Sequence, residues 1–502
     1  MFRLVFISFI FLLTNVRLYA QEDEFRRAYN DFNRQAKQEY EDFRNRANKE
    51  YAEFVRQAWE WHKKIAPMPR PKDEMIPPVV IRDEDKKRSK EDNLVVIEDV
   101  IDVPSPKPQP KPVSPIKEQP DPIATNLHFT LYGTEMTVRV NNEMKFHLRD
   151  LKIESIAEIW ENSFSTNDYN NLIRDCLENR IRYQLSDWAY LKMLKALSEE
   201  FLGRGTNEAE LLKAYLYCQS GYQMKLAIVE GNLSMLFSSQ HLIFDLPGLE
   251  IDGQIYYAED IKGDQVLVCP ASFPQEQPLS LLINNEQKFA YSPSEERIIT
   301  SEDADWLSIR IAENLNTIEF CNDYPTSSIG DDFMTRWAMY ANTPFNANIA
   351  QSLYSQFVTI FKQFKNANLK DGEDERILIP AYVDILCHWV QTAFVYEYDD
   401  KVWGHDRAFF ADETLYYPYC DCEDRSILLT RMVRDLLGLK CALVYYPGHL
   451  ATAIAMGENV KGDFIRIDGV KYLVCDPTYI GASIGMTMPD MDNKSAKVIV
   501  LK

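Results

Sequence analysis

Several signatures of common protein classes are missing from this chain of 502 residues. It contains no phosphate-binding loop, no dinucleotide-binding glycine pattern and no zinc-protease motif, so we expect neither a cofactor nor a metal. After the first twenty residues, no apolar run is long enough to span a bilayer. The sequence therefore predicts a globular protein without a transmembrane span in its mature form.

Cysteine is scarce, with nine residues spread thinly along the chain. This spacing excludes a small disulfide-stapled scaffold, and the odd count leaves at least one thiol free or paired between chains. Five of the nine lie between Cys387 and Cys475. We therefore look for chemistry in the carboxy-terminal third.

Positive charge is also in short supply, because 55 basic side chains face 76 acidic ones for a formal charge of −21. Such a surface repels a polyanion, so nucleic acid is a poor partner. A hydrophobic content of 46% supplies an ample core for two or three domains.

The amino-terminal segments have distinct compositions. Residues 1–20 combine Arg3, an apolar stretch and a small residue at Ala20, which predicts a cleavable signal peptide and a secreted or periplasmic location. Residues 21–65 repeat every 11 residues, as in AYNDFNRQAKQ and EYEDFRNRANK. This period predicts one long amphipathic helix with a coiled-coil-like stripe, which packs on its own protein or a second copy, or docks on a partner.

Residues 66–122 hold 13 of the 25 prolines and a charged run from Arg82 to Asp92, which predicts an extended linker. The remainder alternates helical and strand-like patterns, so we expect α+β domains at 123–300 and 301–502, with a polar break near 292–303. A hairpin is expected around Gly133, and helices are expected at 154–160, 168–177, 187–201, 208–219, 346–366 and 380–394.

Three residues of the last domain have the types and order of a thiol enzyme. Cys422 precedes a helical apolar pattern that ends at Gly438, so it sits at a helix amino terminus, where a thiolate is favoured. His449 follows a Pro-Gly turn and opens a strand, and Asp476 ends another strand. A Cys–His pair with an orienting carboxylate is a working nucleophile, so Cys422, His449 and Asp476 form a candidate catalytic triad.

These motifs resemble the transglutaminase-like superfamily. Cys422-Glu-Asp-Arg-Ser-Ile-Leu-Leu is similar to its nucleophile motif, Gly-His449-Leu-Ala-Thr-Ala-Ile to its histidine strand, and Tyr-Leu-Val-Cys-Asp476-Pro-Thr to its acid strand. The resemblance covers roughly residues 330–490 and departs at Cys420, where the family commonly has glycine. It implies a papain-like α+β fold that attacks an amide or ester carbonyl of a protein or peptide.

The resemblance also implies an acyl-enzyme, which water resolves in a protease or amidase and an amine resolves in a cross-linking acyltransferase. We favour the hydrolase and keep the acyltransferase as the alternative. The expected oxyanion donors are the Cys422 backbone N–H and a side chain, either Gln391 or Trp389.

Two further interpretations stay open at this stage. Residues 208–260 echo residues 425–476, with Gly205 in the place of Cys422 and Asp260 in the place of Asp476, which suggests either a degenerate duplicate or a chance similarity. Outside catalysis, the chain would be a binding or assembly protein, or would hold zinc through Cys420, Cys422, His449 and Cys475.

Overall fold

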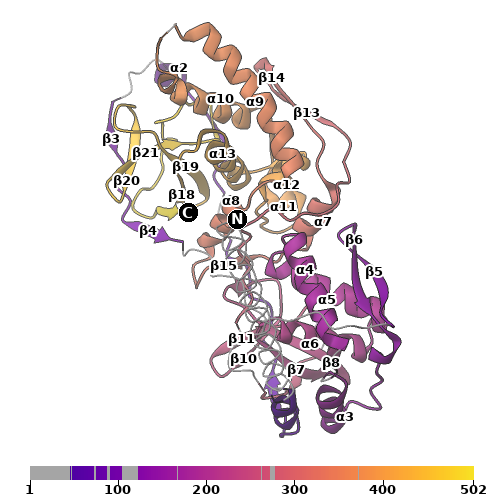
Figure 1. The fold of residues 1–502 in the computed structure, drawn as a ribbon. Helices are drawn as coiled ribbons and strands as arrows, with labels where there is room; N and C mark the ends of the chain where they lie inside the picture. Colours follow the sequence, from indigo (N-terminus) through magenta and orange to yellow (C-terminus); the bar gives the residue numbers. More distant parts are fainter. Residues whose placement is uncertain are drawn as a thin grey trace, which may run out of the picture.

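The computed structural model describes residues 46, 48–72, 75–86, 91–103, 123–164, 166, 168–259, 261, 263–271, 277–370 and 372–501. The predicted signal peptide, the repeats before residue 46, the proline run at 104–112 and Asp260 lie outside these residues. Within the described part, helices and strands alternate as expected for an α+β protein. The chain forms two adjoining units, seen as the magenta and the orange-to-yellow halves of Figure 1.

The amino-terminal unit places helices α3 to α6 against antiparallel strands. Its sheet has the order β1-β12-β7-β8-β11-β10, and the predicted hairpin around Gly133 is confirmed as β5 paired with β6. The elements are α3 (Ile153–Glu158), α4 (Asp168–Arg182), α5 (Asp187–Leu202), α6 (Asn207–Gln219), β1 (Glu60–Lys63), β5 (Thr125–Leu131), β6 (Thr134–Val140), β7 (Met224–Val229), β8 (Asn232–Ser238), β10 (Gly248–Ile251), β11 (Gln254–Tyr257) and β12 (Gln265–Val268).

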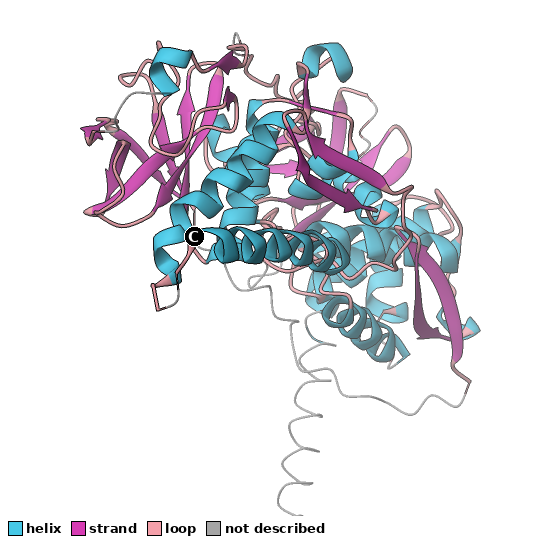
Figure 2. Cartoon of the chain, turned by 90° about the horizontal axis from the view of Figure 1, so that it is seen from above, coloured by secondary structure: helices cyan, strands magenta, loops and turns pink. Residues whose placement is uncertain are grey.

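The carboxy-terminal unit packs helices against a sheet of the order β3-β20-β21-β19-β18-β23-β4. Figure 2 shows strands gathered at one side with helices packed beside them. The main elements are β13 (Arg297–Ser301), β14 (Ala304–Ile311), α7 (Leu315–Asp323), α8 (Arg336–Asn342), α9 (Ala347–Asn368), α10 (Ile379–Thr392), α12 (Ala411–Tyr416), α13 (Cys422–Leu437), β18 (Cys441–Tyr446), β19 (His449–Ala455), β20 (Asp463–Ile467), β21 (Val470–Cys475) and β23 (Lys497–Val500).

Short elements complete the described part. They are β9 (Leu242–Ile243), β15 (Ser327–Ser328), β16 (Val395–Tyr396), α11 (Asp399–Val402), β17 (Tyr419–Cys420) and β22 (Tyr479–Ile480). β9 and β15 pair across the two units, and one apolar core runs from the first unit to Ile427 and Leu450 of the second. None of the helices in the described part has an apolar stretch long enough to cross a membrane.

The two sheets share one connectivity. In each unit a long helix precedes a hairpin (β7–β8 or β18–β19), a second hairpin follows (β10–β11 or β20–β21), and a last strand (β12 or β23) pairs with the first. The second hairpins even turn alike, since Asp252-Gly253 and Asp468-Gly469 all have positive φ. Asp-Gly is the sequence that such a tight turn favours. The similarity between residues 208–260 and 425–476 therefore extends to topology.

The prediction of a single helix to residue 65 is wrong at its end. Residues 48–55 are helical, but β1 follows and pairs antiparallel with β12. The helical part buries Tyr51, which stacks on Trp160 with ring centroids 4.3 Å apart. Tertiary pairing with a sheet edge thus overrides the local helical pattern, and the described end of the repeat packs on its own protein.

The prediction of an unpacked linker at 66–122 is also wrong for much of its described part. β2 (Val79–Val80), β3 (Asn93–Leu94) and β4 (Asp99–Asp102) pair with β22, β20 and β23, and α2 (Asp83–Lys86) lies between β2 and β3. The purple β3 and β4 flank the yellow strands in Figure 1. At the end of the charged run, Asp92 lies 2.7 Å from the buried ammonium of Lys471.

The predicted domain boundary at residue 300 falls inside β13. The segment 292–303, expected to be a polar break, contains this strand, and Ile299 of the strand belongs to the core of the second unit. Alternating burial in β13 escaped prediction because charged neighbours dilute the pattern. The other predicted helices agree with expectation to within a few residues, apart from α4, which runs on to Arg182, and the sequence did not predict α7, α8, α11 and α12.

Candidate active site

Helix α13 begins at Cys422 because the residues around it cap the helix. The Asp421 side chain accepts a hydrogen bond from the Glu423 backbone N–H, and Asp424 accepts one from the Asp421 N–H. Gly438 ends the helix in the left-handed conformation, with φ at +65°. The predicted bounds of this helix, from Cys422 to Gly438, are confirmed.

Cys422 is 1% exposed and lies against the first residues of β19. The Ser426 hydroxyl, one turn along the helix, donates a 2.8 Å hydrogen bond to the Leu450 carbonyl, which fixes α13 on this strand. The Leu450 backbone N–H in turn hydrogen-bonds the Cys422 thiol. The thiol therefore lies next to the backbone that carries His449.

His449 and Asp476 are in direct contact. His449 Nε2 lies 2.8 Å from Asp476 Oδ2, and both side chains are buried. The other carboxylate oxygen of Asp476 accepts hydrogen bonds from the backbone N–H groups of Thr478 and Tyr479. His449 Nδ1 is buried and has no hydrogen-bond partner among the described residues. Because Asp476 occupies Nε2, Nδ1 is the ring atom left to exchange a proton.

Both residues that we expected to donate to an oxyanion have other partners. Gln391 donates to the carbonyls of Asp476, Tyr479 and Ala482, and its own carbonyl accepts from Gly481. Trp389 donates to the Ile299 carbonyl. The prediction is therefore wrong for both, and Gln391 instead holds the loop that carries Asp476.

Tyr396 is the residue that the sequence did not reveal. Its hydroxyl is buried without a hydrogen-bond partner in the described part of the chain, and burial followed by the charge of Cys422 raises the pKa of this phenol. β16 pairs parallel with β17, which brings Tyr396 beside Cys420 and close to the start of α13. No sequence motif marks this position, because the pairing that places it is tertiary.

The environment of Cys422 favours the neutral thiol. Burial raises its pKa well above the usual range, and the charges of Asp421 and Glu423 raise it further. The Leu450 N–H acts in the opposite direction. Backbone N–H groups at a helix amino terminus can stabilise a thiolate, but in the first turn of α13 they already donate to the Asp421 carboxylate. A resting thiol, rather than a preformed ion pair, follows from this arrangement.

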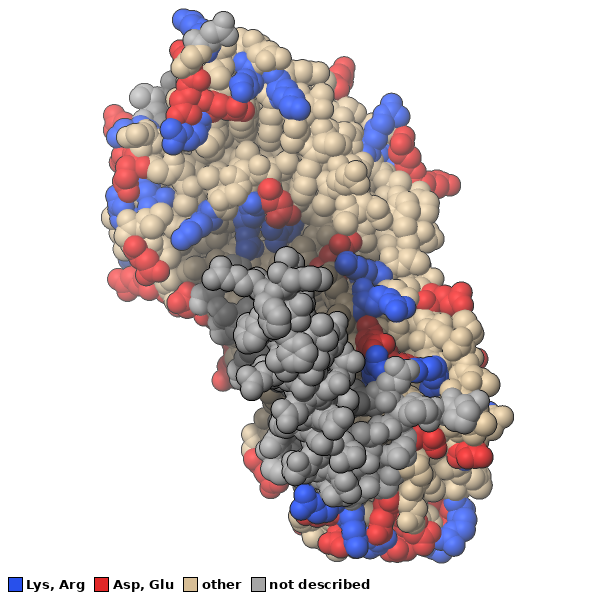
Figure 3. All heavy atoms as spheres, viewed as in Figure 1, with Lys and Arg blue, Asp and Glu red and all other residues tan. Residues whose placement is uncertain are grey.

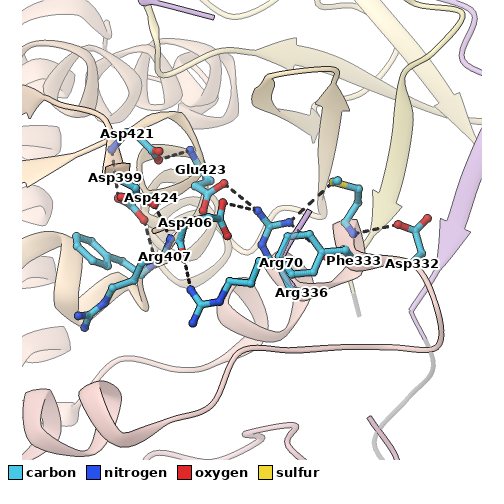
Figure 4. A network of polar contacts seen from close by, with 12 residues as sticks. Arg70, Asp332, Phe333, Arg336, Asp399, Asp406, Arg407, Asp421, Glu423 and Asp424 are labelled. Atoms are coloured by element: carbon cyan, nitrogen blue, oxygen red, sulfur yellow. Dashed lines mark hydrogen bonds and ion pairs between the residues drawn. The ribbon is translucent and has the colours of Figure 1, made fainter. Parts of the chain in front are cut away.

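An acidic cluster of carboxyl groups around Arg336 lines the same cavity as Cys422, and Figure 4 shows its polar contacts. Arg336 is buried, lies over the rings of Phe333 and Trp337, and pairs with Asp406 at 3.0 Å and with Glu423 at 3.5 Å. Burial, then repulsion from Glu423, raises the pKa of Asp399 to about 8. Burial, then the charge of Asp406, raises the pKa of Glu423 well above its usual range.

Metal binding can be judged from side-chain spacing. Among the described residues, the group with metal-like spacing is Asp399, Asp406 and Glu423, where the cation of Arg336 already lies. The zinc set that the sequence left open is not assembled within this part of the chain, because Cys475 is hydrogen-bonded to Cys387 and the Cys420 thiol faces the Val395 carbonyl. All nine cysteines are free thiols.

A cavity of about 340 Å³ opens onto the triad. Cys422 and His449 line it together with the acidic cluster, Trp337 and Tyr398. The structure thus brings the three sequence-predicted residues together. His449 and Asp476 share a direct hydrogen bond, and Cys422 and His449 line the same cavity.

Comparison with known protein families, with curated proteins and with solved structures finds no match to this chain.

Proposed function

We propose that this protein is a cysteine hydrolase of transglutaminase-like type, with a papain-like arrangement of α13, β19 and β21. Cys422 is the nucleophile, His449 the general base and Asp476 the group that orients the imidazole. Two observations carry the proposal: the buried His449–Asp476 pair, whose Nδ1 has no partner among the described residues, and the cavity that His449 and Cys422 line together. The substrate is an amide of a protein or peptide.

The reaction starts from the neutral thiol. Cys422 Sγ bonds to the carbonyl carbon while its proton passes to Nδ1 of His449, and the Asp476 carboxylate stabilises the imidazolium. The C–N bond then breaks, and the amine leaves with the proton from His449. Water, deprotonated by His449, attacks the thioester, which releases the acid and restores the thiol.

The oxyanion in this scheme is stabilised by two donors. One is the backbone N–H of Cys422, the first residue of α13, where helical N–H groups have no partner within the helix. The other is the buried hydroxyl of Tyr396, which no described residue hydrogen-bonds. Such donors act strongly because water is excluded from the site.

Hydrolysis rather than transamidation is favoured because the cavity is acidic. Asp400 and Asp406 line it with Cys422, so an amine would bind there as its protonated and non-nucleophilic form. The alternative function is that of an acyltransferase, in which an amine instead of water resolves the same acyl-enzyme. Secretion or a periplasmic location remains part of the proposal through the signal peptide.

We infer further that the amino-terminal unit is a copy that lost its nucleophile. By strand register, Asn232 opens β8 where His449 opens β19, since they face Val229 and Tyr446 respectively. A cavity of about 370 Å³ lies at the corresponding place and is lined by Gly205, Asn232 and Glu259. Glu259 there pairs with Lys192 and Lys195, so an ion-pair network lies where the second unit has its triad.

The proposal is tested by the reactivity of the nine thiols. Residues 21–502 are treated with iodoacetamide from about pH 5 to 9, and modified sites are located by peptide mass spectrometry. Cys422 should react fastest, and His449→Ala should remove this advantage, whereas His388→Ala, which changes a half-exposed histidine paired with Asp303, should not. A Cys422 rate that is indifferent to His449 would leave a binding or assembly protein as the better description.

A further inference from the structure

One segment of the chain crosses the candidate active site. The strap, which we define as the described residues 66–72 and 75–81, follows a bridge between Ile65 and Gly248 in the sheet of the first unit. It leads into β2, which pairs with β22 in the second unit. The strap is therefore held at one end by each unit, with the cavity of Cys422 between them.

On one side of the cavity, Arg70 fastens the strap. Its guanidinium pairs with Asp245 in the first unit and donates to the backbone carbonyl of Asp406 in the second (Figure 4). Asp245 is itself held, since its other oxygen accepts a hydrogen bond from the Thr326 N–H. Charge-assisted hydrogen bonds of this kind are among the stronger polar contacts in proteins.

On the other side, the strap pairs with the backbone beside the catalytic histidine. The Ile76 N–H donates a 2.9 Å hydrogen bond to the carbonyl of Gly448, the residue directly before His449. Further along, Ile81 is buried with Tyr479 and Met488 in a small apolar cluster. This geometry is that of an extended chain adding to a strand end, a common mode of peptide recognition.

Between these anchors, strap residues form part of the cavity wall. Pro71, Lys72 and Met75 line the same cavity as Cys422 and His449. Met75 packs against the apolar core that includes Cys422, and the Lys72 ammonium lies 3.5 Å from Asp400. A basic side chain of the strap thus pairs with one carboxylate at the exposed rim of the cavity. Figure 3 shows basic and acidic side chains interspersed on the face of the molecule that it displays.

We propose that the strap occupies the groove in which an extended polypeptide substrate binds, and that it therefore acts as a built-in inhibitor of the Cys422 site. The inference rests on the proposed function, because it names the substrate class of that site. In this inference, the Gly448 carbonyl accepts a backbone hydrogen bond from the substrate. A basic side chain of the substrate binds near Asp400, where Lys72 of the strap lies. Displacement or cleavage of the strap would open the site.

The test compares a small and a bulky thiol probe on the full mature chain. Arg70→Ala removes the anchor on one side and Ile76→Pro removes the backbone donor on the other. Arg82→Ala is the matched control, because Arg82 pairs with Glu84 and Asp85 at the surface, beyond the cavity. Thermal melting establishes that each variant is folded, and Arg70→Ala suffices should the proline variant unfold.

We expect both strap variants to raise the rate at which a maleimide-linked polyethylene glycol modifies Cys422 by about tenfold, the effect of one lost charge-assisted hydrogen bond. Labelling by iodoacetamide should change little, since it is small enough to use the existing cavity. A synthetic peptide of residues 66–81 should protect Cys422 of Arg70→Ala, whereas the same peptide with its basic residues changed to glutamate should not.

Folded strap variants whose bulky-probe rates equal those of wild type and Arg82→Ala would overturn the inference. The peptide arm is equally decisive, because protection by the glutamate version would refute the basic subsite. A different result would overturn the proposed function of the Cys422 site. In that case iodoacetamide labelling of Cys422 ignores His449→Ala, whatever the strap variants do to the bulky probe.

Discussion

Replacement of Asp476 by asparagine isolates the orienting role of this carboxylate. The amide would keep the shape of the side chain, and its oxygen can still accept from the backbone N–H groups of Thr478 and Tyr479. Its NH₂ group would then face His449 Nε2 in place of the acceptor oxygen. The imidazole must accept there, so its proton moves to Nδ1, the atom that is needed as the base.

The size of the effect follows from the lost contact. A hydrogen bond to a charged group contributes about 1.5–3 kcal/mol, and every 1.4 kcal/mol is tenfold, so Asp476→Asn should slow alkylation of Cys422 at pH 7 by about 10- to 100-fold. Turnover of a peptide substrate should fall further, by about 10⁴-fold, as the wrong tautomer does in a serine triad. Alkylation that is quenched at timed intervals and analysed by mass spectrometry measures the slowing at Cys422 without any substrate.

Asp463→Asn is the matched control, because this aspartate lies on the neighbouring β20 and binds Asn93 and the Thr487 N–H instead. It should leave Cys422 reactivity unchanged. If Asp476→Asn remains folded and alkylates Cys422 as fast as the control, Asp476 does not orient the base, and the reasoning from the 2.8 Å contact fails.

Three further outcomes follow from the structure. Tyr396→Phe should lower kcat for peptide hydrolysis by about 100-fold yet leave alkylation rates alone, since alkylation builds no oxyanion; equal losses in both assays would remove Tyr396 from the oxyanion site. The pKa of Asp399, raised to about 8, means that the folded state holds an extra proton between about pH 4 and 8, so stability falls as pH rises through this window. Asp399→Asn should therefore raise the melting temperature at pH 9 by about 2 °C or more and have little effect at pH 4, and an equal shift at both pH values would contradict this. Gly438→Ala should cost about 1 kcal/mol in denaturant unfolding because φ is +65°, with partial recovery by Gly438→Asn, and no loss would show that the cap is dispensable.

Local sequence determined the elements that carry the candidate triad. The cap residues around Cys422 and the glycine at 438 set the bounds of α13, and the Pro-Gly turn made His449 the first residue of β19. These signals are short-range, since capping and turn chemistry depend on a few adjacent residues. The order of nucleophile, histidine and acid was therefore visible before any fold was known.

The tertiary structure decided what the surrounding residues do. Gln391 had the right type for an oxyanion donor, but its amide is consumed by the loop after Asp476, and only the fold shows this. Tyr396 gained a place beside Cys420, close to the start of α13, through a two-residue parallel pairing that leaves no periodic trace in the sequence. The pKa of Cys422 likewise depends on burial, which local sequence does not specify.

The amino-terminal segments show the same division most clearly. Helical repeats predicted a helix to residue 65, and prolines with charges predicted a free linker. Both predictions rest on how a segment behaves in water without tertiary partners. In the fold, β1, β3 and β4 gain backbone hydrogen bonds at the edges of the two sheets, and β2 gains them in a separate pairing with β22. Sequence by itself determined the composition of the strap, whereas long-range strand pairing decided that it lies across the candidate active site.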